Sequence, residues 1–192
     1  MSLLGDAKGR IIAYFRGDPN LKKLKKRGLR VGKNFNMLGG CIIDHSHSCL
    51  ISIGDDVTFA PRVHILAHDA STKKDLGYTR IALTSIGSRV FVGAGSIVMP
   101  GVSIGNDSII GAGSIVTRDI PAGQIAVGNP AKVICSKESY LDKQKSEMEK
   151  LPVFGEKYTL GGLHSRAARG NGPIPQGRWR PGFYSVIEAR CA

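Results

Sequence analysis

The sequence lacks the features that mark several protein classes. None of its apolar runs reaches the roughly eighteen residues needed to cross a bilayer. The first ten residues, MSLLGDAKGR, place Asp6 and Lys8 where a secretory signal needs uninterrupted apolar residues. The four cysteines form no CxxC pair and are too few for a disulfide scaffold. We therefore expect an unexported, cytoplasmic protein without a membrane span.

The net charge of +12 lies mainly in the two flanks of the sequence. Residues 1–30 carry nine Lys and Arg against two acidic residues, residues 31–134 carry eight against seven, and residues 135–192 carry ten against six. A nucleic-acid binder usually presents basic residues on its folded surface, interleaved with aromatic ones. Because the middle is nearly neutral, we expect no nucleic-acid partner. The basic flanks are interpreted as solvated helix faces or as an attraction for anionic substrates.

An internal repeat organises the middle of the chain. Between Ile86 and Pro121 the sequence falls without a gap into the hexads IGSRVF, VGAGSI, VMPGVS, IGNDSI, IGAGSI and VTRDIP. Each hexad begins with a β-branched aliphatic residue, four of the six have Gly second, and the fifth residue is small or aliphatic. A period of six fits neither an α-helix nor a plain strand. It predicts a short strand and a corner that repeat, so that three hexads close one triangular coil of about eighteen residues.

The same spacing extends upstream with two interruptions. Two triplets of apolar residues keep the six-residue step: Ile53, Phe59 and Ile65, and, more loosely, Val31, Met37 and Ile43. The register slips between the two triplets, and a polar loop over residues 71–85 separates Ile65 from Ile86. Glycine is expected at the second positions because it tolerates corner dihedrals that other residues resist. We predict a β-helix over residues 31–134 with this inserted loop, since a β-sandwich would show turn signals every eight to twelve residues.

The flanks predict a cap, a helix and a tail. Short amphipathic stretches in residues 1–30 predict a helical cap over the first coil, whose open end would otherwise expose apolar side chains and unpaired backbone groups. The run KESYLDKQKSEMEK predicts a helix from about Lys137 to Lys150, because it lacks Gly and Pro and carries opposite charges at helical spacing. The remainder of residues 135–192 is Gly-, Pro- and Arg-rich without periodicity, which predicts an extended, partner-dependent or disordered tail.

Four segments carry a resemblance to a known family: APRVHILAHDAS, LGYTRI, GAGSIVTRDIP and GNPAKVI. They resemble the maltose and galactoside O-acetyltransferase group of hexapeptide-repeat enzymes, especially its polysaccharide-modifying, capsule-type members, over roughly Val31 to Ile134. The resemblance implies an all-β fold, a left-handed parallel β-helix, assembled as a homotrimer. It also implies acetyl transfer from acetyl-CoA to a hydroxyl or amino group of a sugar or polysaccharide precursor in clefts between subunits. The handedness rests on the resemblance alone, because parallel crossovers are otherwise right-handed.

His68 is the residue that the resemblance places as the catalytic base. Acyl transfer needs a group that takes the proton from the attacking hydroxyl or amine, and an imidazole can do so at neutral pH. Four of the five histidines precede the loop, but only His68 occupies the family's catalytic position, where the loop begins. Its neighbour Asp69 should point the other way in an extended strand, so Asp69 is not predicted to orient it.

The resemblance also implies contacts for the two substrates. The backbone N–H of Ala94 would stabilise the oxyanion. Acetyl-CoA would contact Ala94 and residues further along the chain, namely Ala112, Thr117, Arg118 and Lys132, the last two as cations for its phosphates. Cys135 stands where family members often have a second basic residue. On the acceptor side, Asp44 would bind sugar hydroxyls and Tyr78 would lie over the site as a stacking surface.

Two other functions are possible for a coil of this kind. The clustered histidines suggest a zinc enzyme like the γ-class carbonic anhydrases, but only His64 and His68 show a plausible spacing for ligands, so no metal is expected. A non-catalytic β-helix binding protein would show regular ladders of outward-facing residues, whereas the outward positions here are mixed. The sequence leaves open the identity of the acceptor, the choice between O- and N-acetylation, whether the acyl group is always acetyl, and the role of the tail after Gly161.

Overall fold

A computed structural model of the chain describes residues 19–149, 153–154 and 183–184. The chain forms two compact units, Met1–Glu138 and Ser139–Ala192. Among the described residues, no helix combines the length and the apolar character that crossing a bilayer requires.

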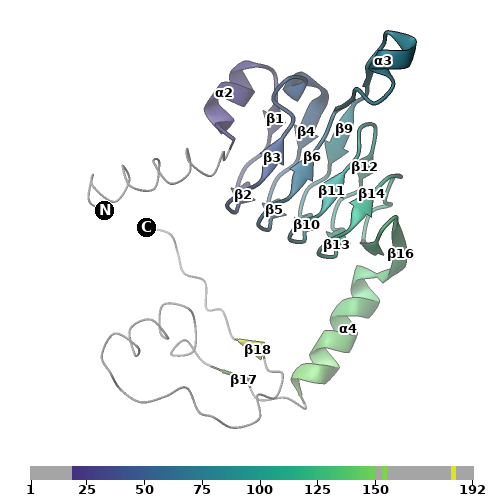
Figure 1. The fold of residues 1–192 in the computed structure, drawn as a ribbon. Coiled ribbons are helices and arrows are strands. Elements are labelled where there is room, and N and C mark those ends of the chain that lie inside the picture. Colours follow the sequence, from purple (N-terminus) through teal and green to yellow (C-terminus); the bar gives the residue numbers. More distant parts are fainter. Residues whose placement is uncertain (1–18, 150–152, 155–182, 185–192) are drawn as a thin grey trace, which may run out of the picture. The chain divides into compact units, whose positions relative to one another are not determined.

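Three β-sheets make up the coil of the first unit (Figure 1). The first sheet contains β1 (Arg30–Val31), β4 (Ile51–Ile53), β9 (Thr84–Ile86) and β12 (Ser103–Ile104). The second contains β2 (Asn36–Met37), β5 (Thr58–Phe59), β10 (Phe91–Val92), β13 (Ile109–Ile110), β15 (Gln124–Gly128) and β16 (Ala131–Ser136). The third contains β3 (Ile42–Ile43), β6 (His64–Ile65), β11 (Ile97–Val98) and β14 (Ile115–Val116). All neighbours pair in parallel except β15 and β16.

The chain visits the first, second and third sheets in turn, which confirms the predicted cycle of strand, corner and repeat. Leading residues of hexads pair eighteen residues apart, as Ile86 does with Ile104 and Val98 with Val116. All six leading residues are at most 3% exposed, and the six fifth-position residues are at most 4% exposed. Each buried aliphatic side chain contributes roughly 1.5–3 kcal/mol, so the stacked columns stabilise coils that could not persist singly.

The second-position glycines serve a different purpose from the one expected. A Cβ on Gly93 would lie 2.5 Å from the backbone nitrogen of Ala112, and a Cβ on Gly105 would lie 2.3 Å from that of Ala122. Neither glycine has a positive φ. The prediction of corner dihedrals at these positions was therefore wrong, because glycine is required there by the close approach of the next coil. The left-handed dihedrals occur two residues later, as at Gly95 with φ +70°.

The N-terminal end of the coil carries helix α2 (Leu21–Lys26). The Asn20 side chain caps it by accepting a hydrogen bond from the Lys23 N–H at 3.0 Å. Leu24 and Leu29 are buried and belong to the hydrophobic core. A cap formed by the whole of residues 1–30 stays a prediction, because the earlier amphipathic stretch of that segment lies outside the described residues.

Helix α4 (Lys137–Met148) begins at the predicted residue and ends two residues before the predicted end. In the second unit, β17 (Val153–Phe154) pairs in parallel with β18 (Phe183–Tyr184). The rest of the predicted tail lies outside the described residues.

Candidate active site

Two breaks in the repeat fall at one corner of the coil, between the third and first sheets. Ile43 pairs with Ile65 across 22 residues instead of eighteen, which adds four residues after β3. Ile65 pairs with Val98 across 33 residues, which adds fifteen after β6. The first break follows Ile43 and the second follows Ile65, so both enlarge the same corner in successive coils.

The second break is the projecting loop. It begins with β7 (His68–Asp69), which pairs antiparallel with β8 (Arg80–Ile81), and between them lies the short helix α3 (Lys73–Leu76). The predicted range, 71–85, ends two residues too late. Thr84 already belongs to the coil, because it pairs with Ile51 and its Oγ1 donates to the Leu66 carbonyl at 2.8 Å.

A buried carboxylate joins the two breaks. Asp44, 4% exposed, accepts hydrogen bonds at Oδ1 from the backbone N–H groups of Ser46 and His47, at 3.0 and 3.1 Å. Its Oδ2 accepts the Ala67 N–H at 3.1 Å and contacts Nδ1 of His68. These four partners match the acceptor capacity of a carboxylate. Within the chain, Asp44 is therefore engaged by its neighbours and holds the His68 ring.

The ionisation of Asp44 determines the tautomer of His68. Burial raises the pKa of the Asp44 carboxyl, but the hydrogen bonds from His68, His47 and Ala67 outweigh burial and lower the pKa below its ordinary 3.8. An ionised carboxylate only accepts hydrogen bonds, so Nδ1 of His68 donates. In neutral His68 the other ring nitrogen, Nε2, then carries the lone pair.

His47 lies against the same pair. Its ring centroid is 4.8 Å from that of His68, and its Nδ1 is 4.0 Å from Oδ1 of Asp44. Within the described part of the chain, this buried nitrogen has no hydrogen-bond partner. The side chains of His47 and His68 are 33% and 36% exposed, so ligands can reach both rings. The sequence interpretation did not single out His47, although the slip in register beside it was a signal.

Asp69 does not take part in this group. Its Oδ1 accepts the Ser71 N–H at 2.9 Å, and this contact lowers the pKa of its carboxyl. His64 is also separate. It lies on β6 between its pairing partners Ile42 and Ile97, with its side chain outward from the core. The pair that motivated the zinc-enzyme alternative is thus not assembled, and among the described residues the group that could hold a metal is Asp44, His47 and His68.

Other predicted residues gather at a different corner, between the second and third sheets. Ala94 follows β10 and Ala112 follows β13, both exposed, and the Gly113 N–H donates to the Ala94 carbonyl at 2.8 Å. Within the described residues, the Ala94 N–H donates no hydrogen bond. Lys132 is exposed on β16 and pairs with Val127, near the end of the second sheet that leads to this corner.

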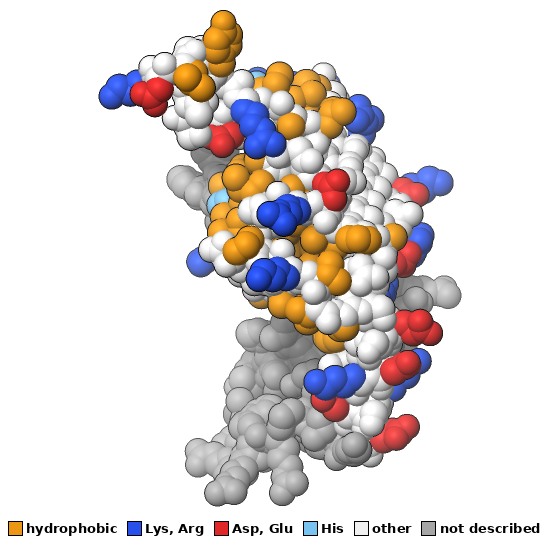
Figure 2. All heavy atoms as spheres, turned by 90° about the vertical axis from the view of Figure 1, so that its right-hand side faces the viewer, with side chains coloured by type: hydrophobic (Ala, Val, Ile, Leu, Met, Phe, Trp, Pro, Cys, Tyr) orange, Lys and Arg blue, Asp and Glu red, His pale blue; other side chains and the backbone are white. Residues whose placement is uncertain are grey.

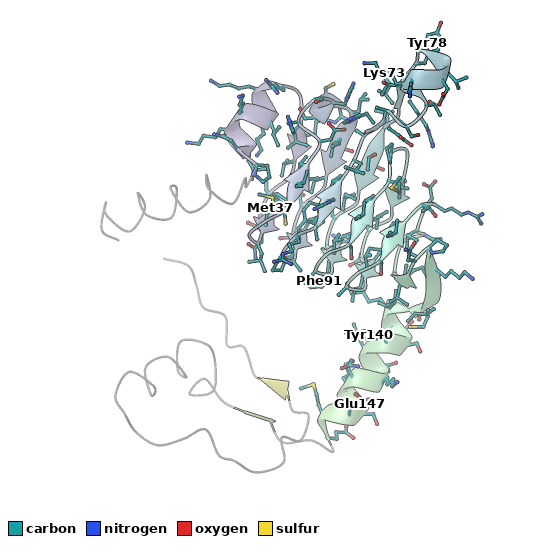
Figure 3. The ribbon with its side chains drawn as sticks, viewed as in Figure 1. Met37, Lys73, Tyr78, Phe91, Tyr140 and Glu147 are labelled. Carbon is teal, nitrogen blue, oxygen red and sulfur yellow. The ribbon has the colours of Figure 1, made fainter. Side chains whose placement is uncertain are left out.

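The remaining predicted residues lie either in the loop or at the corner between the third and first sheets, which carries His68 and is called the His68 corner. Thr117 and Arg118 are exposed and directly follow β14, at the His68 corner but two strands further along the third sheet, roughly 10 Å away. Tyr78 is 80% exposed and lies with Lys73 at the tip of the projecting loop (Figure 3). The structure therefore does not bring Tyr78 onto His68 within one chain.

One chain also keeps His68 apart from Ala94. His68 follows β6, whereas Ala94 precedes β11, the strand that pairs with β6. They lie at opposite ends of the strands of the third sheet, roughly 15–20 Å apart for six extended residues.

This chain is similar to known proteins in sequence and in fold. The family model described as bacterial transferase hexapeptide (six repeats) matches residues 83–118. The protein CapG of Staphylococcus aureus is 42% identical over 129 residues, which cover 63% of this chain and 73% of CapG. A maltose O-acetyltransferase structure from Clostridium difficile 630 is 28% identical with a TM-score of 0.50, covering 66% of this chain and 83% of that one. A galactoside acetyltransferase in complex with coenzyme A is 27% identical with a TM-score of 0.50, covering 68% and 79%.

These relatives identify the chain as an acyltransferase. The chain belongs to the bacterial hexapeptide-repeat transferases. The matched range covers most of the uninterrupted hexads between Ile86 and Pro121, whereas the two breaks in the spacing lie before it.

Proposed function

We propose that this protein transfers an acetyl group from acetyl-CoA to a hydroxyl or amino group of a sugar or polysaccharide precursor, with His68 as general base. The observation that carries the proposal is the contact between Nδ1 of the partly exposed His68 and the buried carboxylate of Asp44. It holds the ring in one tautomer and leaves Nε2 free to accept a proton. The likeness to maltose and galactoside acetyltransferases supports the substrate classes.

The reaction follows from this arrangement. Nε2 of His68 takes the proton of the acceptor hydroxyl or amine while the acceptor atom attacks the thioester carbonyl. The ionised Asp44 stabilises the imidazolium that forms. As the tetrahedral intermediate collapses, the carbon–sulfur bond breaks, and the coenzyme A sulfur receives the proton from His68. The Ala94 N–H is proposed to stabilise the oxyanion, since it has no partner among the described residues.

The cofactor contacts are proposed as the resemblance implies them. Ala112, one coil above Ala94, and the cations Arg118 and Lys132 would line the path of coenzyme A, with Thr117 beside Arg118. All four are exposed, as residues that bind an extended ligand must be. On the acceptor side, Tyr78 stays a prediction. The four contacts of Asp44 favour a positioning role over direct binding of sugar hydroxyls.

The assembly is proposed to be a homotrimer of left-handed β-helices, as in the family that the sequence resembles. The outward residues of the third sheet are mostly aliphatic and stack in register: Ile42, His64, Ile97 and Ile115. Those of the first sheet are polar: Arg30, Ser52, Ser85 and Ser103. Figure 2 shows hydrophobic side chains, with Lys and Arg side chains among them, across the face of the molecule that is turned toward the viewer. An apolar sheet face beside a polar one indicates which side a neighbouring subunit would cover.

A three-fold arrangement would also complete the site. If three copies of the third sheet face one another around an axis, the C-terminal strand ends of each sheet meet the N-terminal strand ends of its neighbour. The His68 corner of one subunit would then lie beside the Ala94 corner of the next. This arrangement brings together the two halves that a single chain keeps apart.

A turnover screen tests the proposed reaction. Release of the coenzyme A thiol from acetyl-CoA is expected to depend on added acceptor when sugars, amino sugars and nucleotide sugars are supplied in turn. Mass spectrometry should then find the acceptor heavier by one acetyl group. Thiol release that is the same with and without every acceptor would contradict the proposal.

Replacing Asp44 with Asn tests the positioning role. The amide group introduced by Asp44→Asn would place its NH2 against N–H donors in either orientation, those of Ser46 and His47 at the Oδ1 position or those of Ala67 and His68 at the Oδ2 position. We expect kcat to fall about 10²-fold or more with a smaller change in KM, and the free energy of unfolding to fall by about 1–3 kcal/mol. Asp69→Asn is the matched control, because Asp69 contacts Ser71 and not His68, and it should keep normal turnover.

The stability loss should depend on pH with a defined sign. Folding lowers the pKa of Asp44, so its ionised form stabilises the protein above its ordinary pKa of 3.8, and this stabilisation is lost as the pH falls through the folded value. The difference in unfolding free energy between wild type and Asp44→Asn should therefore shrink below about pH 3.8. A pH-independent difference would show that the Asp44 charge is not what stabilises the corner.

A further inference from the structure

We propose that Asp44, His47 and His68 form a binding site for a divalent transition metal of the zinc type, and that its occupancy switches off acyl transfer. The switching rests on the proposed function, whereas metal binding does not.

The donor atoms are of the right kind and are close together. One ligand atom from each of the three side chains lies within 4.8 Å of the others. Two imidazoles with one carboxylate suit Zn²⁺, Co²⁺ or Ni²⁺, whereas Mg²⁺ and Ca²⁺ take oxygen ligands. Zinc binds such ligands at about 2.0–2.2 Å, so ligand atoms on one tetrahedral ion lie roughly 3.3–3.5 Å apart. Nδ1 of His47 lies 4.0 Å from Oδ1 of Asp44, close to that spacing. Nδ1 of His68 contacts Oδ2 more closely and would move away from it as the ion replaces the proton between them.

His47 gives a second, independent reason to infer a metal site. Its Nδ1 is buried yet has no hydrogen-bond partner among the described residues. A buried ring nitrogen without a partner, facing a carboxylate that is already held by three backbone N–H groups, is preorganised as a ligand. Both imidazole side chains are about one-third exposed. Solvent can therefore deliver the ion and fill its fourth position.

Metal binding would prevent His68 from acting as a base. The ion would replace the proton on Nδ1 of His68 and would bind the Asp44 carboxylate, which this proton contacts in the metal-free protein. A neutral imidazole bound through Nδ1 carries its remaining proton on Nε2. Nε2 then has no lone pair to receive the acceptor's proton. The metal-bound enzyme is consequently inactive, and a chelator restores it by allowing Nδ1 to be protonated again.

The test uses Co²⁺ as a spectroscopic probe and Zn²⁺ as an inhibitor, on the full chain freed of metal with EDTA. Wild type should bind one equivalent of Co²⁺ with a saturable visible absorption band. His47→Ala should weaken that binding at least about tenfold, because even the loss of an indirect ligand contact typically costs that much. It should raise the Zn²⁺ concentration for half-inhibition by a similar factor, with inhibition measured relative to the variant's own metal-free turnover.

His45→Ala is the matched control, since His45 is an exposed histidine two residues away whose side chain is outside the cluster. It should bind Co²⁺ as wild type does. The metal site is overturned if wild type gives no saturable band, or if His47→Ala binds Co²⁺ as tightly as wild type. The switch is overturned if Zn²⁺ saturates the site without lowering turnover. If wild type proves to have no acyl transfer, the Co²⁺ titration still decides the metal site.

Discussion

Replacing His68 with Ala is expected to lower kcat by about 10²–10⁴-fold, the usual contribution of a general base. The loss should appear in kcat and kcat/KM together, because the proton transfer occurs only in the transition state. The dissociation constant of acetyl-CoA should change little, since the proposed coenzyme contacts come from other residues. Steady-state turnover and calorimetric titration with coenzyme A measure the two effects separately.

His45→Ala is the matched control for this substitution. His45 is exposed, and its side chain lies outside the group formed by Asp44, His47 and His68. It should keep turnover within about threefold of wild type. If His68→Ala retains near-normal turnover, or if both variants lose it equally, His68 is not the base.

The fold was largely predictable because the repeat is carried by buried positions. The β-branched residues that begin each hexad, such as Val92 and Ile110, occur at a fixed spacing and stack in fixed register. That register specified the strands, the corners and the length of the inserted loop. The reason for Gly93 and Gly105 was not predictable, because it depends on how closely one coil approaches the next. The spacing of residues along the sequence does not reveal how closely two coils approach each other.

The site was predictable only in part, for the same physical reason. The resemblance supplied His68, but the partner of His68 comes from Asp44, 24 residues earlier in the sequence, through a corner that two separate insertions enlarge. The resemblance assigns Asp44 to the acceptor, and the hydrogen bonds that its carboxylate accepts from the Ser46, His47 and Ala67 backbone could not be predicted from the sequence. His47 was overlooked because its role depends on that same corner geometry.

The division of the proposed site between two corners leads to a prediction about assembly. His68→Ala removes the base, and Ala94→Trp would block the approach of the thioester with a bulky side chain at an exposed position. Each variant alone is expected to be inactive. Co-expressed in equal amounts, the two should recover about one quarter of wild-type activity. The reason is that three quarters of randomly mixed trimers contain both variants, and each of these has one intact site in three.

The recovery separates a shared site from a self-contained one. If each chain carried its whole site, every chain in the mixture would retain one lesion, and the mixture would be as inactive as its parents. Mixing the purified variants without unfolding them is the control, and it should restore nothing unless subunits exchange. A two-fold ring predicts the same quarter, so the molar mass in solution must be measured alongside. A mass of three chains together with this recovery would place the two halves of the site, the Asp44–His68 corner and the Ala94 corner, on neighbouring subunits.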